Sequence, residues 1–272
     1  MSLSSFSKSS LLRLYPSISD PSVVSNCSPS SLTIAHLNIR SLFGKIDLIS
    51  TSKLSNFDVC MFSESWLSSD TADNLISLDN FQTFRKDRVS GPGGGIVIYV
   101  KSNISAIPLY NLSIDEAESL FLKVPLSPSV PPLILACVYR PPSSNISNFC
   151  TSLINTVDTL SPSSSLILLG DFNINLLSDN HSSNNFKATL SALQISCLNS
   201  LPTRITDCNE SLLDLILTNN PSVHKKSVTY FEDLSDHLII STFLSLNPKR
   251  QPKTLIHKRS FKNFSPDSFF NY

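Results

Sequence analysis

The chain contains six cysteines but no pair spaced C-x-x-C, and this absence disfavours a structural zinc site. It also lacks an apolar run long enough to cross a bilayer, so we expect no membrane partner. The N-terminus has no continuous apolar segment of the kind found in secretory signal peptides. Because Cys60 and Cys137 sit within apolar runs, we interpret them as reduced, buried thiols of a nuclear or cytoplasmic protein.

An excess of charge of either sign is also missing. The 272 residues include 21 basic and 21 acidic side chains, so overall charge does not indicate a nucleic-acid partner and any phosphate-binding surface must be local. The hydrophobic fraction of 41% is sufficient for a large core. Residues 1–31 are rich in Ser and Pro and are expected to form a flexible lead, whereas the basic residues 247–272 are expected to form a tail or linker. The body between them, residues 32–246, is expected to be one domain.

Strand-like and helix-like segments alternate along this body. Apolar runs predict strands over 31–39, 57–64, 93–101, 119–126, 133–142, 166–172, 211–219, 227–231 and 237–244. Helical spacing predicts helices over 43–54, 145–160 and 182–195. No helix separates 119–126 from 133–142, which predicts an antiparallel pair. The pattern favours an α/β (α+β) fold in which two packed mixed β-sheets are flanked by helices.

Polar residues suited to metal binding or proton transfer stand at the ends of several of these strands. They are Asn38, Glu64, Tyr139, Arg140, Asp171, Asn173, Asp214, Asp236 and His237. Each has an ordinary structural interpretation; Asp171 and Asn173, for example, could form an Asx-turn. Asp214 is harder to explain in this way because a carboxylate among leucines is costly to bury without a partner. A buried Asp214 would orient His237.

The order of these clusters resembles a known superfamily. LNIRS, SESW, YRPP, GDFN, LLDLIL and SDH, in that order over about residues 32–246, resemble the endonuclease/exonuclease/phosphatase superfamily. HLNIRSL (36–42), GGGIVIYVK (93–101), VYRPPSS (138–144), LPTRIT (201–206) and LLDLILTN (212–219) are most similar to endonuclease domains of non-LTR retrotransposons. The segment 258–269 resembles the start of the linker toward a reverse transcriptase. The resemblance implies a DNase I-like four-layer sandwich and a monomeric, DNA-nicking phosphodiester hydrolase that uses Mg²⁺ or Mn²⁺ and no other small-molecule cofactor.

The resemblance also implies residues that bind the metal and the phosphate. Glu64 would bind the metal with help from Asn38, and Asp236 would supply a further carboxylate, since Mg²⁺ prefers hard oxygen ligands. Arg140 and Arg204 would contact backbone phosphates.

Further residues are expected to carry the proton transfers. Asp171 would accept the proton of the attacking water, and Asn173 would orient Asp171, because in extended backbone positions two apart point the same way. His237 would donate to a nonbridging phosphate oxygen, and Asp214 would fix its tautomer. Tyr139 would hydrogen-bond the phosphate.

One departure from the pattern and two alternative functions stay open at this point. Arg40 stands where abasic-site enzymes have an acid, which favours the retrotransposon subgroup and leaves the number of metals open. A phosphoesterase of the same fold could act on small or lipid phosphoesters. The chain could also be an inactive, truncated or domesticated nucleic-acid-binding relic.

Overall fold

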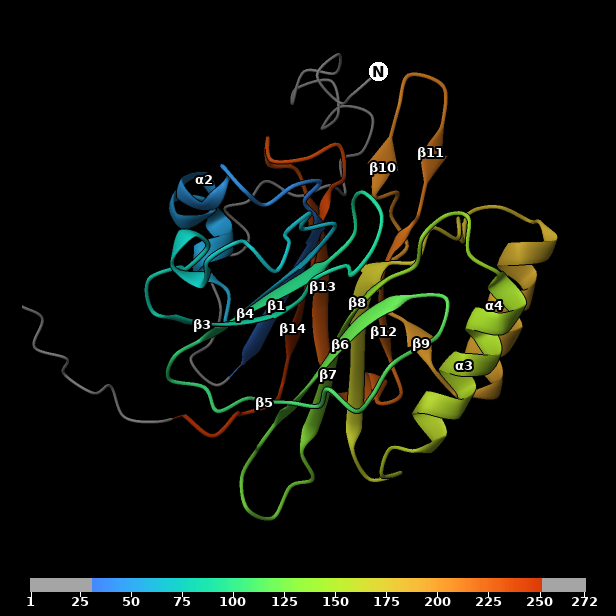
Figure 1. The fold of residues 1–272 in the computed structure, drawn as a ribbon. Helices are drawn as coiled ribbons and strands as arrows, with labels where there is room; N and C mark the ends of the chain where they lie inside the picture. Colours follow the sequence, from blue (N-terminus) through green and yellow to red (C-terminus); the bar gives the residue numbers. More distant parts are fainter. Residues whose placement is uncertain (1–30, 251–272) are drawn as a thin grey trace, which may run out of the picture.

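Two six-stranded sheets lie face to face in the computed structural model, which describes residues 31–250 (Figure 1). Residues 1–30 of the expected lead and 251–272 of the expected tail lie outside the described part. Contacts with the body continue beyond residue 246, because the backbone nitrogen of Lys249 donates to Pro125 at 3.0 Å. Arg250 pairs with Asp58 at 3.2 Å.

The first sheet has the strand order β13-β14-β1-β2-β4-β3. Its strands are β1 (Leu32–Asn38), β2 (Val59–Ser63), β3 (Phe81–Lys86), β4 (Ile96–Lys101), β13 (His224–Tyr230) and β14 (Ile239–Leu244). β1 and β2 run parallel, whereas β14 runs antiparallel to β1. The first sheet is therefore mixed, as predicted.

The second sheet has the order β5-β6-β7-β8-β12-β9. Its strands are β5 (Ile107–Pro108), β6 (Glu118–Val124), β7 (Leu133–Tyr139), β8 (Ser165–Asp171), β9 (Ser196–Cys197) and β12 (Asp214–Thr218). β6 and β7 form the predicted antiparallel pair, and β7 and β8 run parallel. A separate two-stranded hairpin, β10 (Arg204–Ile205) and β11 (Glu210–Ser211), projects from one end of the sandwich (Figure 1).

Helices cover the outer faces of both sheets. α2 (Ile46–Thr51) and the 3₁₀ turn η3 (Lys53–Asn56) lie outside the first sheet, and α3 (Ile146–Asp158) and α4 (His181–Ala192) lie outside the second (Figure 1). Two further 3₁₀ turns, η4 (Asp73–Leu75) and η5 (Pro221–Val223), lie in connections. α3 begins where the side chain of Asn145 accepts from the backbone nitrogen of Asn148 at 3.0 Å, and it buries Phe149 and Leu153 against the sheet.

Alternation of apolar residues along the strands produces three cores. The central core lies between the sheets, and its members include Ile34 of β1 and Leu169 of β8. The opposite faces of the strands pack against the helices, forming one core under α2 and another under α3 and α4. The predicted class, two packed mixed sheets flanked by helices, is confirmed.

Three sequence predictions need correction. The helix predicted over 43–54 is interrupted, because α2 ends at Thr51 and η3 follows it. The strand predicted over 211–219 is divided, with 210–211 in the hairpin and β12 starting at Asp214. β3 was missed because all six of its residues are only partly buried, so it has no continuous apolar run.

Candidate active site

Polar side chains reach one rim of the sandwich through the same alternation that fills the central core. On β1, Ile34 faces the core, and His36 and Asn38 follow at the same two-residue spacing. On β8, Leu169 faces the core and Asp171 follows. These strands end at the rim, so the polar residues close the central core at its edge.

The neighbouring strands place further groups at this rim. Tyr139 ends β7, which runs parallel to β8, and its Cα is the register partner of Asp171. Asp214 begins β12, which runs antiparallel to β8, and it also pairs with Asp171. His237 lies just before β14, which runs antiparallel to β1. Strand direction therefore gathers these polar residues at the same end of each sheet.

Asn38 connects the two sheets at this point. Its side-chain nitrogen donates to Oε1 of Glu64 at 2.9 Å and to Oδ2 of Asp171 at 2.8 Å. Its Oδ1 accepts from the backbone nitrogen of Arg40 at 3.3 Å. The amide nitrogen of Asn38 therefore donates to two carboxylates, and its expected help in holding the metal, which would use Oδ1, stays a prediction.

Asp171 and Asn173 meet as expected, although by a different geometry. Asn173 has a φ of +49°, so the segment leaves extended backbone immediately after β8. Its backbone nitrogen donates to Oδ1 of Asp171 at 3.0 Å and its side-chain nitrogen to Oδ2 at 3.2 Å. The side chain of Asn173 also donates to the carbonyl of Arg140 at 2.9 Å. A left-handed turn, which asparagine tolerates, therefore orients the Asp171 carboxylate.

The surroundings of Asp171 are suited to proton transfer. Burial, with the charge of Asp214, raises the pKa of Asp171 from 3.8 to about 7, while His237 and Asn38 oppose the rise. A carboxyl group that titrates near neutral pH can accept and release a proton efficiently.

Asp214 and His237 form the expected pair. Nδ1 of His237 lies 2.8 Å from Oδ2 of Asp214, and both side chains are buried. Burial alone would lower the pKa of His237, but the Asp214 carboxylate, with Asp171 and Asp236, raises it to about 9. His237 is therefore a charged donor at neutral pH.

A second histidine, His36, was missed by the sequence prediction. It is fully buried, with Nδ1 3.7 Å from Oδ1 of Asp214 and Nε2 3.1 Å from Oγ of Ser63. Burial lowers its pKa to about 4 although Asp214 opposes the shift, so His36 is neutral at pH 7. The available signal was its position two residues before Asn38 on the inner face of β1.

Tyr139 and Arg140 are adjacent in sequence but differ in role. Burial raises the pKa of the Tyr139 hydroxyl above its ordinary value, as do the nearby carboxylates of Glu64 and Asp171. Arg140 is only 1% exposed and donates to the carbonyls of Phe172, Asn173 and Ser144. Its donors are directed at protein carbonyls, so Arg140 stabilises the loop after β8, and this arrangement weighs against the phosphate contact expected from the sequence.

Asp236 lies between two arginines. Its Oδ2 is 2.9 Å from Arg40 and 3.2 Å from Arg204. Burial alone would raise the pKa of Asp236, but His237, Arg40 and Arg204 lower it below its ordinary value. The structure thus places this expected metal carboxylate in an ion-pair cluster. The guanidinium groups of Arg40 and Arg204 remain partly exposed at the rim.

Thr203, in the LPTRIT segment, was also missed as a functional position. Its Oγ1 accepts from the backbone nitrogens of Leu213 at 3.1 Å and Asp214 at 3.0 Å. Its carbonyl accepts from the nitrogen of Leu238 at 2.7 Å. A single buried threonine therefore fixes the backbone beside both Asp214 and His237.

Comparison with known proteins agrees with this architecture. A family model described as endonuclease-reverse transcriptase matches residues 133–241. The endonuclease domain of TRAS1, a telomere-specific non-LTR retrotransposon, matches at 15% identity and a TM-score of 0.62, covering 78% of this chain and 98% of that domain. The chain has the fold of the endonuclease/exonuclease/phosphatase superfamily.

Other solved structures with this superfamily fold match similarly. The catalytic domain of Xenopus laevis APE2 has 14% identity and a TM-score of 0.63, with 82% of this chain and 94% of that one covered. The Neisseria 3′ phosphatase NExo has 15% identity and a TM-score of 0.61, with 78% and 99% covered. No curated protein matches the chain. The resemblance inferred from sequence, including the resemblance to retrotransposon endonuclease domains, is confirmed.

Superfamily nucleases generally use divalent metals, and the rim residues fit such an ion. One ligand atom from each of Asp171, Asp214 and His237 lies within 4.8 Å of the others. Oδ1 of Asp214 is buried without a hydrogen-bond partner. With Glu64 nearby, the rim offers several carboxylate oxygens, and hard oxygen ligands of this kind suit Mg²⁺ or Mn²⁺.

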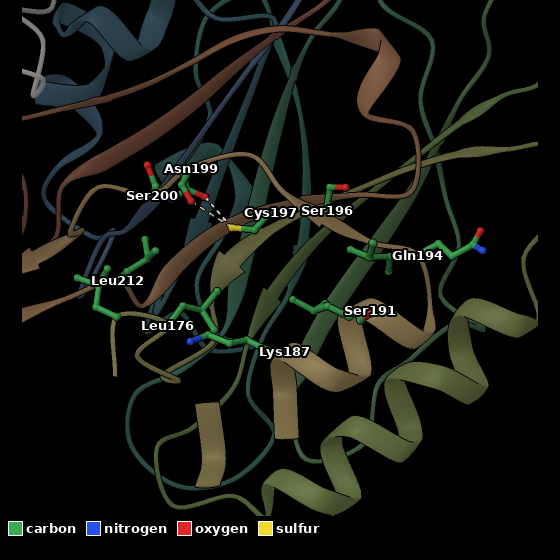
Figure 2. Close-up of a pocket in the computed structure, with 12 residues that line it drawn as sticks. Leu176, Lys187, Ser191, Gln194, Ser196, Cys197, Asn199, Ser200 and Leu212 are labelled. Carbon is green, nitrogen blue, oxygen red and sulfur yellow. Dashed lines mark hydrogen bonds between the residues drawn. The ribbon is translucent and has the colours of Figure 1, made fainter. Parts of the chain in front are cut away.

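A surface cavity lies away from the rim where the predicted site residues gather. This cavity, of about 720 Å³, lies beside α4 and β9 and is lined by residues that include Leu176, Lys187 and Cys197 (Figure 2). No predicted site residue lines it. In the part of the chain that the structure describes, no helix is long and apolar enough to span a membrane.

Proposed function

We propose that this chain is a metal-dependent phosphodiester hydrolase that nicks DNA, of the type found in retrotransposons. The observation that supports this most strongly is the clustering of these side chains at the rim. Asn38 donates to both Glu64 and Asp171, a carboxylate oxygen of Asp171 lies within 4.8 Å of one of Asp214, and Asp214 holds His237. A structural role alone does not require so many buried ionisable groups at one edge, since each must be desolvated.

The proposed reaction divides the work between a base and a donor. Asp171, with its pKa near 7, accepts the proton of the water that attacks phosphorus. Asn173 and Asn38 hold the Asp171 carboxylate in position for this transfer. His237, charged and fixed by Asp214, donates to a nonbridging phosphate oxygen as negative charge develops there.

Three more side chains would bind the cation or the phosphates. Glu64 would hold the divalent cation, and when bound this cation offsets phosphate charge and stabilises the leaving oxygen. Tyr139, whose hydroxyl lies close enough to Glu64 to feel its charge, would turn its single O–H to the phosphate. Arg204, partly exposed beside Asp236, would contact a flanking phosphate.

Two observations favour DNA over a small or lipid phosphoester. The matching family model is described as endonuclease-reverse transcriptase, and the solved structures that match include a retrotransposon endonuclease domain. In such elements, a nick exposes a 3′-hydroxyl that primes reverse transcription. We therefore expect the protein to act on DNA in a nuclear or cytoplasmic compartment. An inactive relic is the less favoured alternative, because the catalytic positions are occupied by competent side chains.

A plasmid assay tests the proposal. Wild-type protein with Mg²⁺ should convert supercoiled plasmid to open circles, and chelation should stop the conversion. Asp171→Ala and His237→Ala should each reduce the rate by at least about 100-fold, the lower range for loss of an acid–base group. Asp158→Ala and His181→Ala are matched controls, because both residues are exposed on the outer helices.

The alternatives give different results in the same assay. Equal inactivity of wild type and variants on plasmid would overturn the DNA-nicking proposal. Hydrolysis of phosphoinositides or sphingomyelin instead would favour the small-substrate enzyme. DNA binding that weakens steeply with salt, without cleavage, would favour the binding relic.

A further inference from the structure

Trp66 is the only tryptophan of the chain, and it lies at the rim two residues after Glu64. Its residue surface is 46% exposed. A single exposed apolar residue is common on proteins, so exposure alone indicates little. The backbone and contacts of Trp66 are unusual, however.

The backbone of Trp66 is strained. Its φ is +56°, a conformation that bulky residues rarely adopt and that is strained for them. The strain is maintained by neighbouring loops, because the nitrogen of Trp66 donates to the carbonyl of Gly94 at 2.8 Å and that of Ser65 to Gly95 at 3.1 Å. The fold thus fixes a tryptophan where glycine would be easier to accommodate.

The indole is fixed as well as the backbone. Its Nε1 donates to Oε2 of Glu64 at 3.1 Å. A Cβ added at Gly93 would lie only 3.3 Å from the same Nε1, so the glycine run leaves room for the ring. Because the only polar atom of the side chain is engaged, the ring surface left accessible is apolar and adjoins the proposed metal carboxylate.

We propose that Trp66 is a substrate-binding residue on which a nucleobase next to the scissile phosphate stacks. This inference rests on the proposed function and specifies what the site recognises: a polymer that carries planar bases. Aromatic rings bind bases irrespective of sequence, since every base has a π-face. An inositol phosphate offers no such face, and a choline phosphate would meet the ring only through its ammonium cation, without stacking. Stacking on Trp66 therefore directs the phosphate chemistry toward nucleotides.

The single tryptophan makes the test direct. In chelator, so that no cleavage occurs, a single-stranded oligonucleotide is titrated into the full chain and Trp66 fluorescence is recorded. Stacking should quench the emission and protect the ring from acrylamide. An oligonucleotide of equal length made of abasic sugar phosphates should bind without this quenching.

Three variants separate stacking from folding. Trp66→Gly suits the positive φ, so it should melt at or above the wild-type temperature and yet bind the base-containing oligonucleotide about tenfold more weakly. Trp66→Phe retains a ring and should bind within about threefold of wild type. Tyr110→Ala is the matched control, because Tyr110 is 64% exposed and lies outside the rim segments.

The outcomes separate this inference from the proposed function. If wild type binds DNA and nicks plasmid, but its fluorescence does not change and Trp66→Gly binds equally well, the stacking role is wrong and the nicking function stands. Equal quenching by the abasic oligonucleotide would also overturn the stacking role. If wild type neither binds nor nicks DNA, both proposals fail.

Discussion

Asp214 lies between two histidines, one of which is held positively charged and the other neutral at pH 7. His237 contacts one carboxylate oxygen at 2.8 Å and has its pKa raised to about 9, whereas His36 lies 3.7 Å from the other and has its pKa lowered to about 4. The difference follows from geometry, because His237 makes a direct hydrogen bond and His36 is fully buried without one to Asp214. One residue thus stays a charged donor while the other stays neutral.

This difference predicts how stability responds to acid in the metal-free protein. The pKa of His36 is below its unfolded value of 6.5, so the unfolded chain binds more protons between about pH 6.5 and 4, and stability falls as the pH is lowered through this range. From pH 7 to pH 5 the contribution of His36 should fall by about 2 kcal/mol. His36→Leu should therefore cost less at pH 5 than at pH 7 in urea unfolding. If the free energies of unfolding of wild type and His36→Leu change equally with pH, the prediction is wrong.

At the scale of elements, Thr203 connects the starts of β12 and β14. The backbone nitrogens of Leu213 and Asp214 both donate to its hydroxyl oxygen, and the backbone nitrogen of Leu238 donates to its carbonyl. β12 is short, and its first residue is the carboxylate that orients His237. The positions of Asp214 and His237 thus depend on a residue outside both strands.

Replacing the Thr203 hydroxyl by a methyl group should separate the contribution of its hydrogen bonds from that of its packing. Thr203→Val keeps the volume but leaves two buried N–H groups without an acceptor, which should lower the free energy of unfolding by about 1–3 kcal/mol. Nicking should fall further, because Asp214 is no longer fixed. Thr203→Ser keeps the hydroxyl and should retain most of both properties. Denaturant unfolding and the plasmid assay measure the two effects; an unchanged Thr203→Val protein would disprove this role.

The glycine of the GDFN segment has a comparable element-level role. A Cβ built on Gly170 would lie 1.8 Å from the carbonyl oxygen of Val138. The close approach of β7 and β8 at this point therefore requires glycine. Gly170→Ala should separate the strands that carry Tyr139 and Asp171. We expect a loss of at least about 1–3 kcal/mol, as for overpacked cores. Thermal melting should show a clear decrease; wild-type stability would contradict the steric argument.

Much of this element arrangement could be predicted from the sequence. Apolar runs located most strands, and the polar residues at or within these runs located Asp171, Asp214 and Glu64. The left-handed turn at Asn173 and the burial of Arg140 could not be predicted, because both depend on loop contacts with distant carbonyls. His36 was missed because a histidine inside an apolar run is ordinarily part of a core.

At the scale of the whole molecule, the site exists only when the two sheets are packed together. Glu64 and His237 come from the first sheet, and Asp171 and Asp214 from the second. Asn38 joins the two sides through Glu64 and Asp171. A divalent cation held between these carboxylates would bind the folded sandwich and not the unfolded chain, so metal binding and folding should be linked.

This linkage predicts a metal-dependent melting temperature. Mg²⁺ at ten times its dissociation constant should add about 1.4 kcal/mol to the free energy of unfolding. For a domain of this size that corresponds to a rise of about 3–6 °C in Tm. Glu64→Gln should abolish the rise because it removes the carboxylate charge, whereas Asp158→Asn, on the outer helix α3, should retain it. Because the readout is folding and not cleavage, a relic that kept its metal site would still show the shift. An equal rise in Glu64→Gln would place the ion elsewhere, leaving Asp171 and Asp214 as the remaining carboxylate ligands of the cluster.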